Sequence, residues 1–256
     1  MAAPKNPFKA ALKSATPQIG LWMCMADSYA AEITAGAGYD WLVIDGEHSP
    51  NDLRSTLRAL QAMAAMPVNP VVRVPIGKEY LIKQVLDIGA QNILVPMVET
   101  AEQARALVQA VRYPPHGRRG VGAIGARATN FGRVADYIRT ADAEICLIVQ
   151  VESRAGLEQL DEIAAVEGVD GVFIGPADLS TDMGFAGKTE APEVLTAIYD
   201  ALARIQAQDC AAGILTIDPA QAQIYLDKGA CFVAVGMDVK ILVDGLQTLR
   251  AKFGAG

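Results

Sequence analysis

Polar side chains follow short apolar runs at several places in the chain, and their types suit the binding of a cation and a keto acid. The residues concerned are Asp45, His48, Arg73, Gln150, Glu152 and Asp178. Glu152 and Asp178 have no histidine or cysteine beside them, and such hard oxygen ligands favour an octahedral ion such as Mg²⁺, Mn²⁺ or Co²⁺. Two protein ligands leave positions open for a 2-oxo acid, which can chelate through its carboxylate and keto oxygens. The ion would then act as a Lewis acid and stabilise an enolate.

Arg73 lies within the apolar run P-V-V-R-V, where its burial needs an anion or several acceptors as compensation. At a keto-acid site it would add a second positive charge at the keto oxygen. A structural ion pair is the alternative. The other residues have structural alternatives too: Glu152 could be an acid in the first turn of a helix, and Asp178 could cap a turn. His48 could be a loop histidine that is hydrogen-bonded to Asp45.

The elements that must position these residues begin with eight apolar runs rich in β-branched residues. The runs are 19–25, 41–45, 70–74, 92–97, 145–151, 171–175, 212–217 and 232–237. Most of them are continuous rather than alternating in polarity, which indicates strands that are buried on both faces.

Segments with helical periodicity lie between these runs, at 51–65, 78–88, 101–111, 154–165, 192–208 and 219–228. Gly89 and Gly229 follow two of them and suit left-handed helix C-caps. The repeated alternation predicts a parallel (β/α)8 barrel, in one domain that spans residues 1–256. A barrel gathers the carboxyl ends of its strands at one mouth, where the polar residues would converge. The rival doubly wound sheet would need a glycine-rich phosphate loop after its first strand, and M-A-D-S-Y offers none.

The long interval between the fourth and fifth runs breaks this rhythm. It begins with the segment R-Y-P-P-H-G-R-R-G-V-G at 112–122, and a short helix is predicted at 134–140. A long functional loop is the physical interpretation of such an excursion. A final helix, predicted at 239–253, can pack on its own barrel or be exchanged with a neighbouring subunit.

Composition narrows the classes of function. The chain of 256 residues is 52% hydrophobic, so it can bury a large core, and its formal charge of −7 argues against a nucleic-acid or anionic-membrane partner. No apolar run approaches the roughly 20 residues that cross a bilayer, and residues 1–10 lack a secretory apolar segment. We therefore expect a cytoplasmic protein with a small-molecule substrate. Reduced core thiols are expected at Cys24, Cys146, Cys210 and Cys231.

Several sequence blocks resemble the HpcH/HpaI family of class II pyruvate aldolases over nearly the whole chain. The most specific blocks are R-Y-P-P-H-G-R-R-G-V-G (112–122) and G-P-A-D-L-S (175–180). Further matching blocks are G-L-W-M (20–23), A-G-A-G-Y-D-W-L-V-I-D-G-E-H-S-P-N (35–51), P-V-V-R-V (70–74), L-V-P-M-V (94–98), Q-V-E-S-R (150–154), V-E-G-V-D-G-V-F-I (166–174), T-D-M-G (181–184) and F-V-A-V-G-M-D (232–238).

The resemblance implies a barrel of the phosphoenolpyruvate/pyruvate type, assembled as a homohexamer that is a trimer of dimers. It implies a divalent metal on Glu152 and Asp178, with Arg73 on the keto oxygen. It further implies that Gln150 contacts the substrate and that the backbone around Gly175, Pro176, Ala177 and Asp178 holds the pyruvate carboxylate. His48 would transfer protons through a water, ordered by Asp45 and by Asp87 from a neighbouring subunit.

The activity that this resemblance implies is reversible retro-aldol cleavage of 4-hydroxy-2-oxoheptanedioate and related 4-hydroxy-2-oxo acids to pyruvate and succinic semialdehyde or another aldehyde. One of Arg118, Arg119 and Arg127 could bind the distal carboxylate of the aldehyde, or all three could be loop and subunit contacts. Cleavage of 2-keto-3-deoxy sugar acids, or of a citramalyl- or malyl-type CoA thioester, are alternative functions. A class I aldolase would need a Schiff-base lysine, and the strand cores hold none. A catalytically silent 2-oxo acid binding protein is the non-enzymatic alternative.

Overall fold

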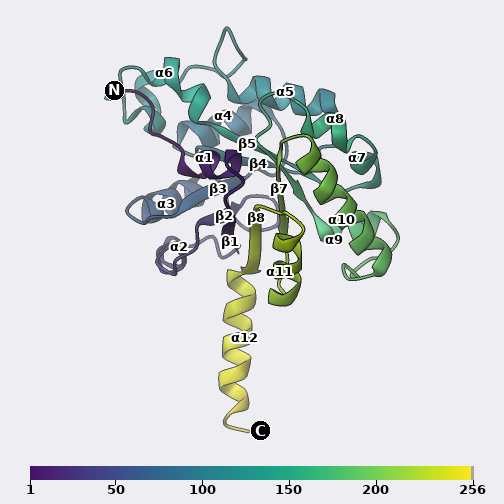
Figure 1. Cartoon of the computed structure of the whole chain (residues 1–256). Coiled ribbons are helices and arrows are strands. Elements are labelled where there is room, and N and C mark those ends of the chain that lie inside the picture. The colour runs from purple at the N-terminus through teal and green to yellow at the C-terminus, as the bar shows by residue number, and fades with distance from the viewer. Residues whose placement is uncertain (255–256) are drawn as a thin grey trace.

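Eight parallel strands close into a barrel in the computed structural model, which describes residues 1–254 (Figure 1). The strands pair in chain order, and β8 pairs with β1 to complete the ring. Their bounds are β1 Gln18–Met23, β2 Trp41–Asp45, β3 Asn69–Arg73, β4 Asn92–Val95, β5 Cys146–Val151, β6 Gly171–Ile174, β7 Ala211–Leu215 and β8 Phe232–Met237. Every predicted apolar run overlaps one of these strands. The predicted (β/α)8 barrel is therefore confirmed, and the open doubly wound sheet is excluded.

Helices alternate with the strands and cover the outside of the barrel. Their buried residues recur at helical spacing; α3, for example, buries Thr56, Ala59, Leu60 and Met63. The covering helices are α2 Ser28–Ala35, α3 Leu53–Met63, α4 Glu79–Asp87, α5 Ala101–Val111, α7 Arg154–Glu158, α8 Leu160–Ala164, α9 Pro176–Asp182, α10 Pro192–Ala207 and α11 Pro219–Asp227. Among the residues described, no helix is both long enough and apolar enough to cross a membrane.

The helix ends follow the local signals in the sequence, with one difference. Gly89 and Gly229 lie just beyond α4 and α11 with φ of 106° and 90°, as expected of C-cap glycines. The helix predicted at 154–165 is instead two short helices, because the backbone at Gln159 (φ −98°, ψ 10°) leaves the helical region and ends α7.

The interior of the barrel is filled by an aromatic column. Helix α1 (Pro7–Lys13) places Phe8 below the barrel, with ring centroids 5.7 Å from Trp41 and 6.1 Å from Phe232. Phe232 packs in turn on Phe173, which contacts Trp22 at 5.4 Å. The column therefore runs from α1 at the amino-terminal end of the strands to the mouth at their carboxyl ends.

The predicted excursion between β4 and β5 carries only short helices. These are η1 Ala123–Gly125, η2 Arg127–Thr129, α6 Tyr137–Thr140 and η3 Ala141–Glu144. The segment is tied to the start of the chain, since the backbone N–H of Ala3 donates to Thr140 Oγ1 at 2.8 Å and that of Asp136 donates to the Met1 carbonyl at 3.0 Å. Figure 1 accordingly shows the N-terminus beside α6.

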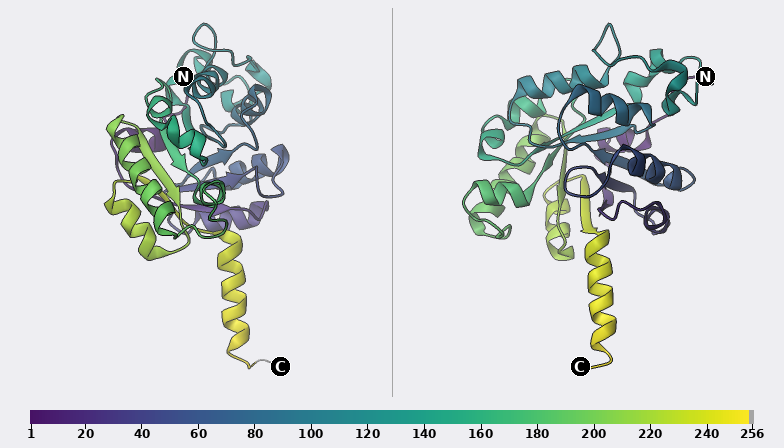
Figure 2. Two further views of the ribbon diagram at one scale, coloured as in Figure 1. Left: turned by 90° about the vertical axis from the view of Figure 1, so that its right-hand side faces the viewer. Right: turned by 180° about the vertical axis from the view of Figure 1, so that it is seen from behind.

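The last helix, α12 (Asp238–Ala251), projects away from the barrel (Figures 1 and 2). Only its base is anchored: the Asp238 carboxylate accepts hydrogen bonds from the backbone N–H groups of Cys24 and Met25 at 2.8 and 3.1 Å. Its large apolar side chains are about half exposed, at Ile241, Leu242, Val243, Leu246 and Leu249. The helix therefore does not pack on its own barrel.

Candidate active site

A cavity of about 230 Å³ opens at the carboxyl ends of the strands. Trp22 and Phe173, at the top of the aromatic column, form part of its wall. All the site residues predicted from the sequence except Asp87 line this cavity: Asp45, His48, Arg73, Gln150, Glu152, Gly175, Pro176, Ala177 and Asp178. No lysine is among the lining residues within the described part of the chain.

Arg73 is fixed in the cavity wall by two acids and an indole. Because Asp45 and Arg73 are register partners at the ends of β2 and β3, their side chains meet directly. Arg73 Nε and Nη2 donate to the two Asp45 oxygens at 2.8 and 2.7 Å, a bidentate pair, and the guanidinium lies 4.9 Å from the centroid of the Trp22 ring. Burial would raise the pKa of Asp45, but the hydrogen bonds and charge of Arg73 hold that pKa below its ordinary value.

Glu47 is a site residue that the sequence interpretation missed. Its Oε2 lies 2.8 Å from Arg73 Nη1, and its side chain is only 16% exposed. Burial raises the pKa of Glu47, and Arg73 opposes that rise. The available signal was its place between Asp45 and His48 in D-G-E-H, but the direction of a side chain in a loop does not follow from its spacing.

His48 differs from the expectation that Asp45 orders its imidazole. Both Asp45 oxygens accept hydrogen bonds from Arg73, and the contact of His48 with Asp45 is made by its backbone N–H, at 3.5 Å. The imidazole is 64% exposed at the mouth, with Nε2 3.8 Å from Glu47 Oε1. Within this chain, Asp45 therefore orients the arginine rather than the histidine.

Glu152 is a buried carboxylate at the end of β5. Oε1 accepts a 2.9 Å hydrogen bond from the backbone N–H of Met97, which adopts φ of 55°, and Oε2 accepts from Gln150 Nε2. Burial raises the Glu152 pKa from 4.5 to about 7 against these hydrogen bonds, and repulsion from Asp178 and Glu47 adds to the rise. The hydrogen bonds therefore do not fully compensate the burial of the Glu152 carboxylate, and a nearby cation would do so.

Gly175 and Asp178 complete the wall opposite Arg73. A Cβ at Gly175 would collide with the Glu152 carboxylate, so only glycine lets the chain pass there. Helix α9 follows at once, with Gly175 as its N-cap and no side chain on its first N–H groups. The exposed Asp178 lies in its first turn and lines the same cavity as Glu152.

Gln150 has a buried hydrogen-bond acceptor without a partner, beside the Glu152 carboxylate. Its side-chain oxygen, Oε1, is buried without a hydrogen-bond partner, while its amide nitrogen binds Glu152. Such an orphaned acceptor is rare in folded proteins and indicates a missing donor or cation. Among the described residues, no group of three or more His, Cys, Asp and Glu side chains is arranged to hold a metal ion.

Cys24 also lines the cavity but is not a nucleophile. Its Sγ lies 3.9 Å from Asp45 Oδ2. Burial, together with the negative charges of Asp45 and Asp238, raises the pKa of the Cys24 thiol to about 12. It therefore stays protonated. All four cysteines are free, as the sequence predicts.

Asp87 lies away from this cavity. It is the last residue of α4, and its Oδ1 accepts a 3.1 Å hydrogen bond from Arg119 Nη2. Arg119 is buried, with its guanidinium 4.4 Å from the centroid of the Tyr113 ring. Contact between Asp87 and His48 would thus require a second subunit, and that contact remains a prediction.

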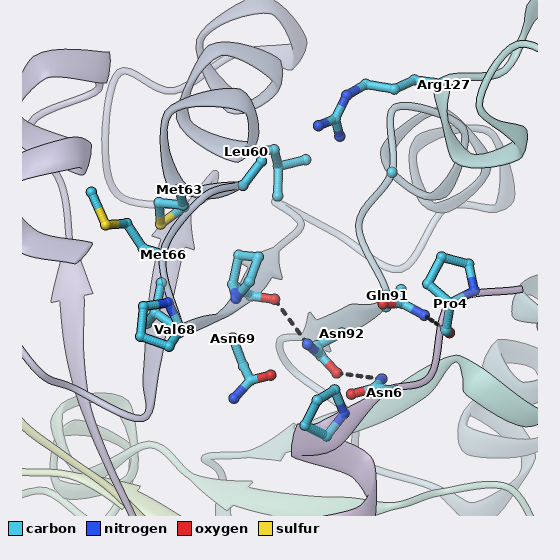
Figure 3. A pocket seen from close by; sticks show the side chains of 15 residues that line it. Pro4, Asn6, Leu60, Met63, Met66, Val68, Asn69, Gln91, Asn92 and Arg127 are labelled. Atoms are coloured by element: carbon cyan, nitrogen blue, oxygen red, sulfur yellow. Dashed lines mark hydrogen bonds between the residues drawn. The ribbon is translucent and has the colours of Figure 1, made fainter. Parts of the chain in front are cut away.

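The excursion arginines do not line the cavity of their own chain. Arg118 pairs with Glu79 at 2.9 Å on the surface, and Arg119 is buried at Asp87. Arg127 donates to the Ile88 carbonyl at 2.9 Å and borders a different cavity, beside the starts of β3 and β4 (Figure 3). None of them can bind a substrate carboxylate in the same subunit.

Comparison with known proteins places the chain in a family. The family model described as HpcH/HpaI aldolase/citrate lyase matches residues 18–245. A hydroxypyruvate/pyruvate aldolase of Deinococcus radiodurans is 62% identical over 248 residues, which cover 97% of this chain and 90% of that protein. A 4-hydroxy-2-oxo-heptane-1,7-dioate aldolase of Salmonella dublin is 53% identical over 251 residues, which cover 98% and 95%.

A solved structure agrees with these sequence relatives. The crystal structure of an HpcH/HpaI aldolase/citrate lyase family protein from Burkholderia cenocepacia superposes with a TM-score of 0.95 at 40% identity, covering 98% of this chain and 100% of that one. The chain therefore belongs to the HpcH/HpaI aldolase/citrate lyase family and is a lyase of the aldolase type.

Proposed function

We propose that the chain is a divalent-metal-dependent aldolase that reversibly cleaves 4-hydroxy-2-oxo acids, among them 4-hydroxy-2-oxoheptanedioate, to pyruvate and an aldehyde. The observation that carries the proposal is the buried Glu152 carboxylate, which shares a cavity with Asp178 and has a pKa raised to about 7. The curated relatives named above are aldolases of pyruvate, hydroxypyruvate or 4-hydroxy-2-oxo-heptane-1,7-dioate.

The donor groups fit a hard divalent cation. Glu152 and Asp178 would hold it, and the orphaned Gln150 Oε1 provides an acceptor beside them. Carboxylate and amide oxygens suit Mg²⁺, Mn²⁺ and Co²⁺ alike. When bound, the cation supplies a Lewis acid that polarises the keto group and stabilises negative charge on its oxygen.

The protein's own residues would orient the substrate and stabilise the negative charge that develops on it. The first N–H groups of α9, at Ala177 and Asp178, have no side-chain cap and are available to the pyruvate carboxylate. Arg73, held rigid by Asp45 and Glu47, directs a positive charge at the keto oxygen without reorganisation. The 4-hydroxyl group loses its proton, the C3–C4 bond breaks, and the methylene carbon of the pyruvate enolate takes up a proton.

His48 is the proposed proton-transfer residue, acting through a water and supported by Asp87 of a neighbouring subunit. Substitution of His48 by alanine should lower kcat about 100-fold, the lower end for general acid–base catalysis, because the imidazole is 64% exposed. Metal affinity should not change. Steady-state kinetics and calorimetric titration with Mn²⁺ test both statements, and an unchanged kcat would remove His48 from the mechanism.

Removal of the metal is the direct test of the proposed function. Chelator-treated protein should lose condensation of pyruvate with aldehydes, and Mg²⁺, Mn²⁺ or Co²⁺ added back singly should restore it to different extents. Full activity after chelation, together with covalent trapping of pyruvate by borohydride, would instead indicate a Schiff-base enzyme. Replacing pyruvate by hydroxypyruvate tests a second candidate donor, which the name of the Deinococcus relative suggests for this chain.

The predicted hexamer and exchange of the last helix are also proposed for this chain. Helix α12 exposes Ile241, Leu242 and Leu246 to 54%, 49% and 59%, which leaves an apolar face for another subunit to cover. Leu246→Asp should dissociate the assembly in light-scattering and sedimentation measurements. Lys240→Gln, which breaks only the exposed pair with Asp244, is the matched control and should leave the assembly intact. A monomeric wild-type protein would refute the proposal.

A further inference from the structure

The segment R-Y-P-P-H-G-R-R-G-V-G at 112–122 contributes no side chain to the cavity of the candidate active site. Two of its residues, Tyr113 and Arg119, are nevertheless buried beneath the excursion between β4 and β5. The Arg119 guanidinium lies 4.4 Å from the ring centroid of Tyr113 and 5.9 Å from that of Tyr137. Substrate contact within one subunit therefore does not explain why this arginine is buried.

Arg119 is a buried cation with incomplete hydrogen bonding. Its side chain is fully buried, and its Nη2 donates to Asp87 Oδ1 at 3.1 Å. Its Nε and Nη1 are buried without any acceptor among the residues described. Contact with two aromatic rings offsets only part of the cost of burying a guanidinium in this way. Within residues 1–254 the anion that Arg119 contacts is Asp87, so its placement concerns that carboxylate.

Asp87 is itself in an unfavourable position. It is the last residue of α4, where its carboxylate faces the negative end of the helix dipole. Arg119 supplies a compensating charge at Oδ1, and Oδ2 receives no hydrogen bond from residues 1–254. The chain at Gly122 passes so close that a Cβ there would lie 2.8 Å from Oδ2. The segment 112–122 thus confines the carboxylate from two sides and leaves one oxygen for an outside donor.

The position of α4 determines where that donor can come from. Because the helix runs antiparallel to the strands, its last residue lies at the opposite rim of the barrel from His48. The Asp87 side chain is 24% exposed there, and the His48 side chain is 64% exposed at the mouth. The two groups can therefore meet only between subunits, which is the contact proposed above.

We infer that Arg119 is a positioning residue, which fixes the Asp87 carboxylate so that its Oδ2 can accept a hydrogen bond from His48 of a neighbouring subunit. The inference rests on the proposed aldolase function and on the proposed role of His48. A carboxylate that holds an imidazole determines which ring nitrogen carries the proton and which is free to exchange protons with water. Arg119 would act on the reaction only through Asp87.

Substitution of Arg119 by methionine removes the charge and keeps an unbranched side chain against the tyrosine rings. For condensation of pyruvate with succinic semialdehyde, kcat should fall about 10- to 100-fold, the range for groups that orient a functional side chain. KM for pyruvate and affinity for Mn²⁺ should not change. Arg118→Met, at the exposed pair with Glu79, is the matched control and should equal the wild type.

The conservative variant Arg119→Lys separates the contact with Asp87 from packing on the tyrosine rings. Its ammonium group can still donate to Asp87 Oδ1, so kcat should recover part of the loss seen with methionine. If the methionine and lysine variants lose kcat equally, packing explains the loss and the inference fails. Unchanged kcat in the methionine variant would overturn it as well.

A double-mutant cycle with His48→Ala separates positioning from general damage to the fold. Adding Arg119→Met to His48→Ala should lower kcat less than about twofold further, because the group that Arg119 positions Asp87 to hold is already absent. A merely structural arginine would lower kcat by the same factor in both backgrounds. Equal factors would therefore overturn the inference.

Mixed oligomers test whether Arg119 acts on the neighbouring subunit. Co-expressed His48→Ala and Arg119→Met chains, purified through two different tags, should recover about a quarter of wild-type kcat per subunit, because a quarter of the sites combine an intact His48 with an intact neighbour. Mixed Asp87→Asn and Arg119→Met chains are the control. They should not recover, since every neighbour then lacks one member of the pair.

The outcomes distinguish this inference from the proposed function. Mixed oligomers without recovered activity, or a protein that forms no oligomers, would overturn the positioning role of Arg119 while leaving the metal-dependent aldolase of the wild type intact. A metal-loaded wild-type protein that neither cleaves 4-hydroxy-2-oxo acids nor exchanges the methyl protons of pyruvate would overturn the aldolase function, and the inference with it. Recovery confined to the His48→Ala and Arg119→Met mixture would support the inference.

Discussion

Replacement of Glu152 by glutamine is expected to abolish metal-dependent activity and yet stabilise the metal-free protein. In the folded state the Glu152 pKa rises from 4.5 to about 7, because burial outweighs the hydrogen bonds from Gln150 and Met97. The native state therefore binds more protons than the unfolded state between these two values, and stability falls as the pH rises through that window. Above pH 7 the full cost of the buried charge is present.

Glutamine removes that charge with little change of shape. At pH 8 the free energy of unfolding of the metal-free variant should exceed that of the metal-free wild type by about 1–3 kcal/mol, which raises its melting temperature, and the difference should vanish near pH 4.5. Its new amide group can pair with the orphaned Gln150 Oε1 once the Gln150 amide turns over. Thermal melts of chelated protein across this pH range measure the effect.

Addition of the metal should make the wild type more stable than the Glu152→Gln variant. Mn²⁺ at about 100 times its dissociation constant should stabilise the wild type by about 2.7 kcal/mol and the variant not at all. The gain should be larger at pH 8 than at pH 6, because below pH 7 the cation must displace a proton from Glu152. Equal stabilisation of both proteins by Mn²⁺ would show that Glu152 is not a ligand.

Substitution of Arg73 by lysine should lower kcat about a thousandfold while the protein remains folded. Lysine keeps the charge but cannot donate to both Asp45 oxygens, reach Glu47 and lie against the Trp22 ring at the same time. Its ammonium group would settle between the two acids and no longer be directed at the keto oxygen. The loss should appear in kcat and in exchange of the pyruvate methyl protons.

Arg73→Ala should have a different signature, since it leaves Asp45 and Glu47 without their counter-charge. Breaking a buried ion pair in this way costs about 3–5 kcal/mol, so a large drop in melting temperature should accompany the lost activity. Arg118→Lys, at an exposed pair with Glu79, is the control and should match the wild type in both. A lysine variant within tenfold of wild-type kcat would exclude a directed role for the guanidinium.

The barrel was predictable from the sequence because its strands are buried on both faces. Burial on both faces demands continuous apolar runs, and the eight runs stand out against the periodic helices. The convergence of Arg73, Glu152 and Asp178 then follows from the geometry of a closed parallel sheet. Even the pairing of Asp45 with Arg73 is a consequence of register, since both residues end their strands.

Other features depend on contacts that spacing does not encode. Glu47 and His48 are neighbours in one loop, yet the first turns inward to Arg73 and the second points to solvent. Asp87 and Arg119 are 32 residues apart and meet only because the excursion folds back on α4. The direction of α12 depends on what covers it, and a single chain does not contain that information.

The aromatic column under the cavity determines from which side ligands can enter and leave. Phe8, Trp41, Phe232 and Phe173 pack against one another beneath the cavity and fill the barrel toward the amino-terminal ends of its strands, so we expect ligands to enter and leave at the carboxyl ends. In the proposed reaction, pyruvate binds at Arg73 and Glu152, and the aldehyde reaches it from the same mouth, so the aldehyde should leave before pyruvate. The packed aromatic column should thus give the proposed reaction an ordered kinetic mechanism, in which pyruvate binds first and is released last.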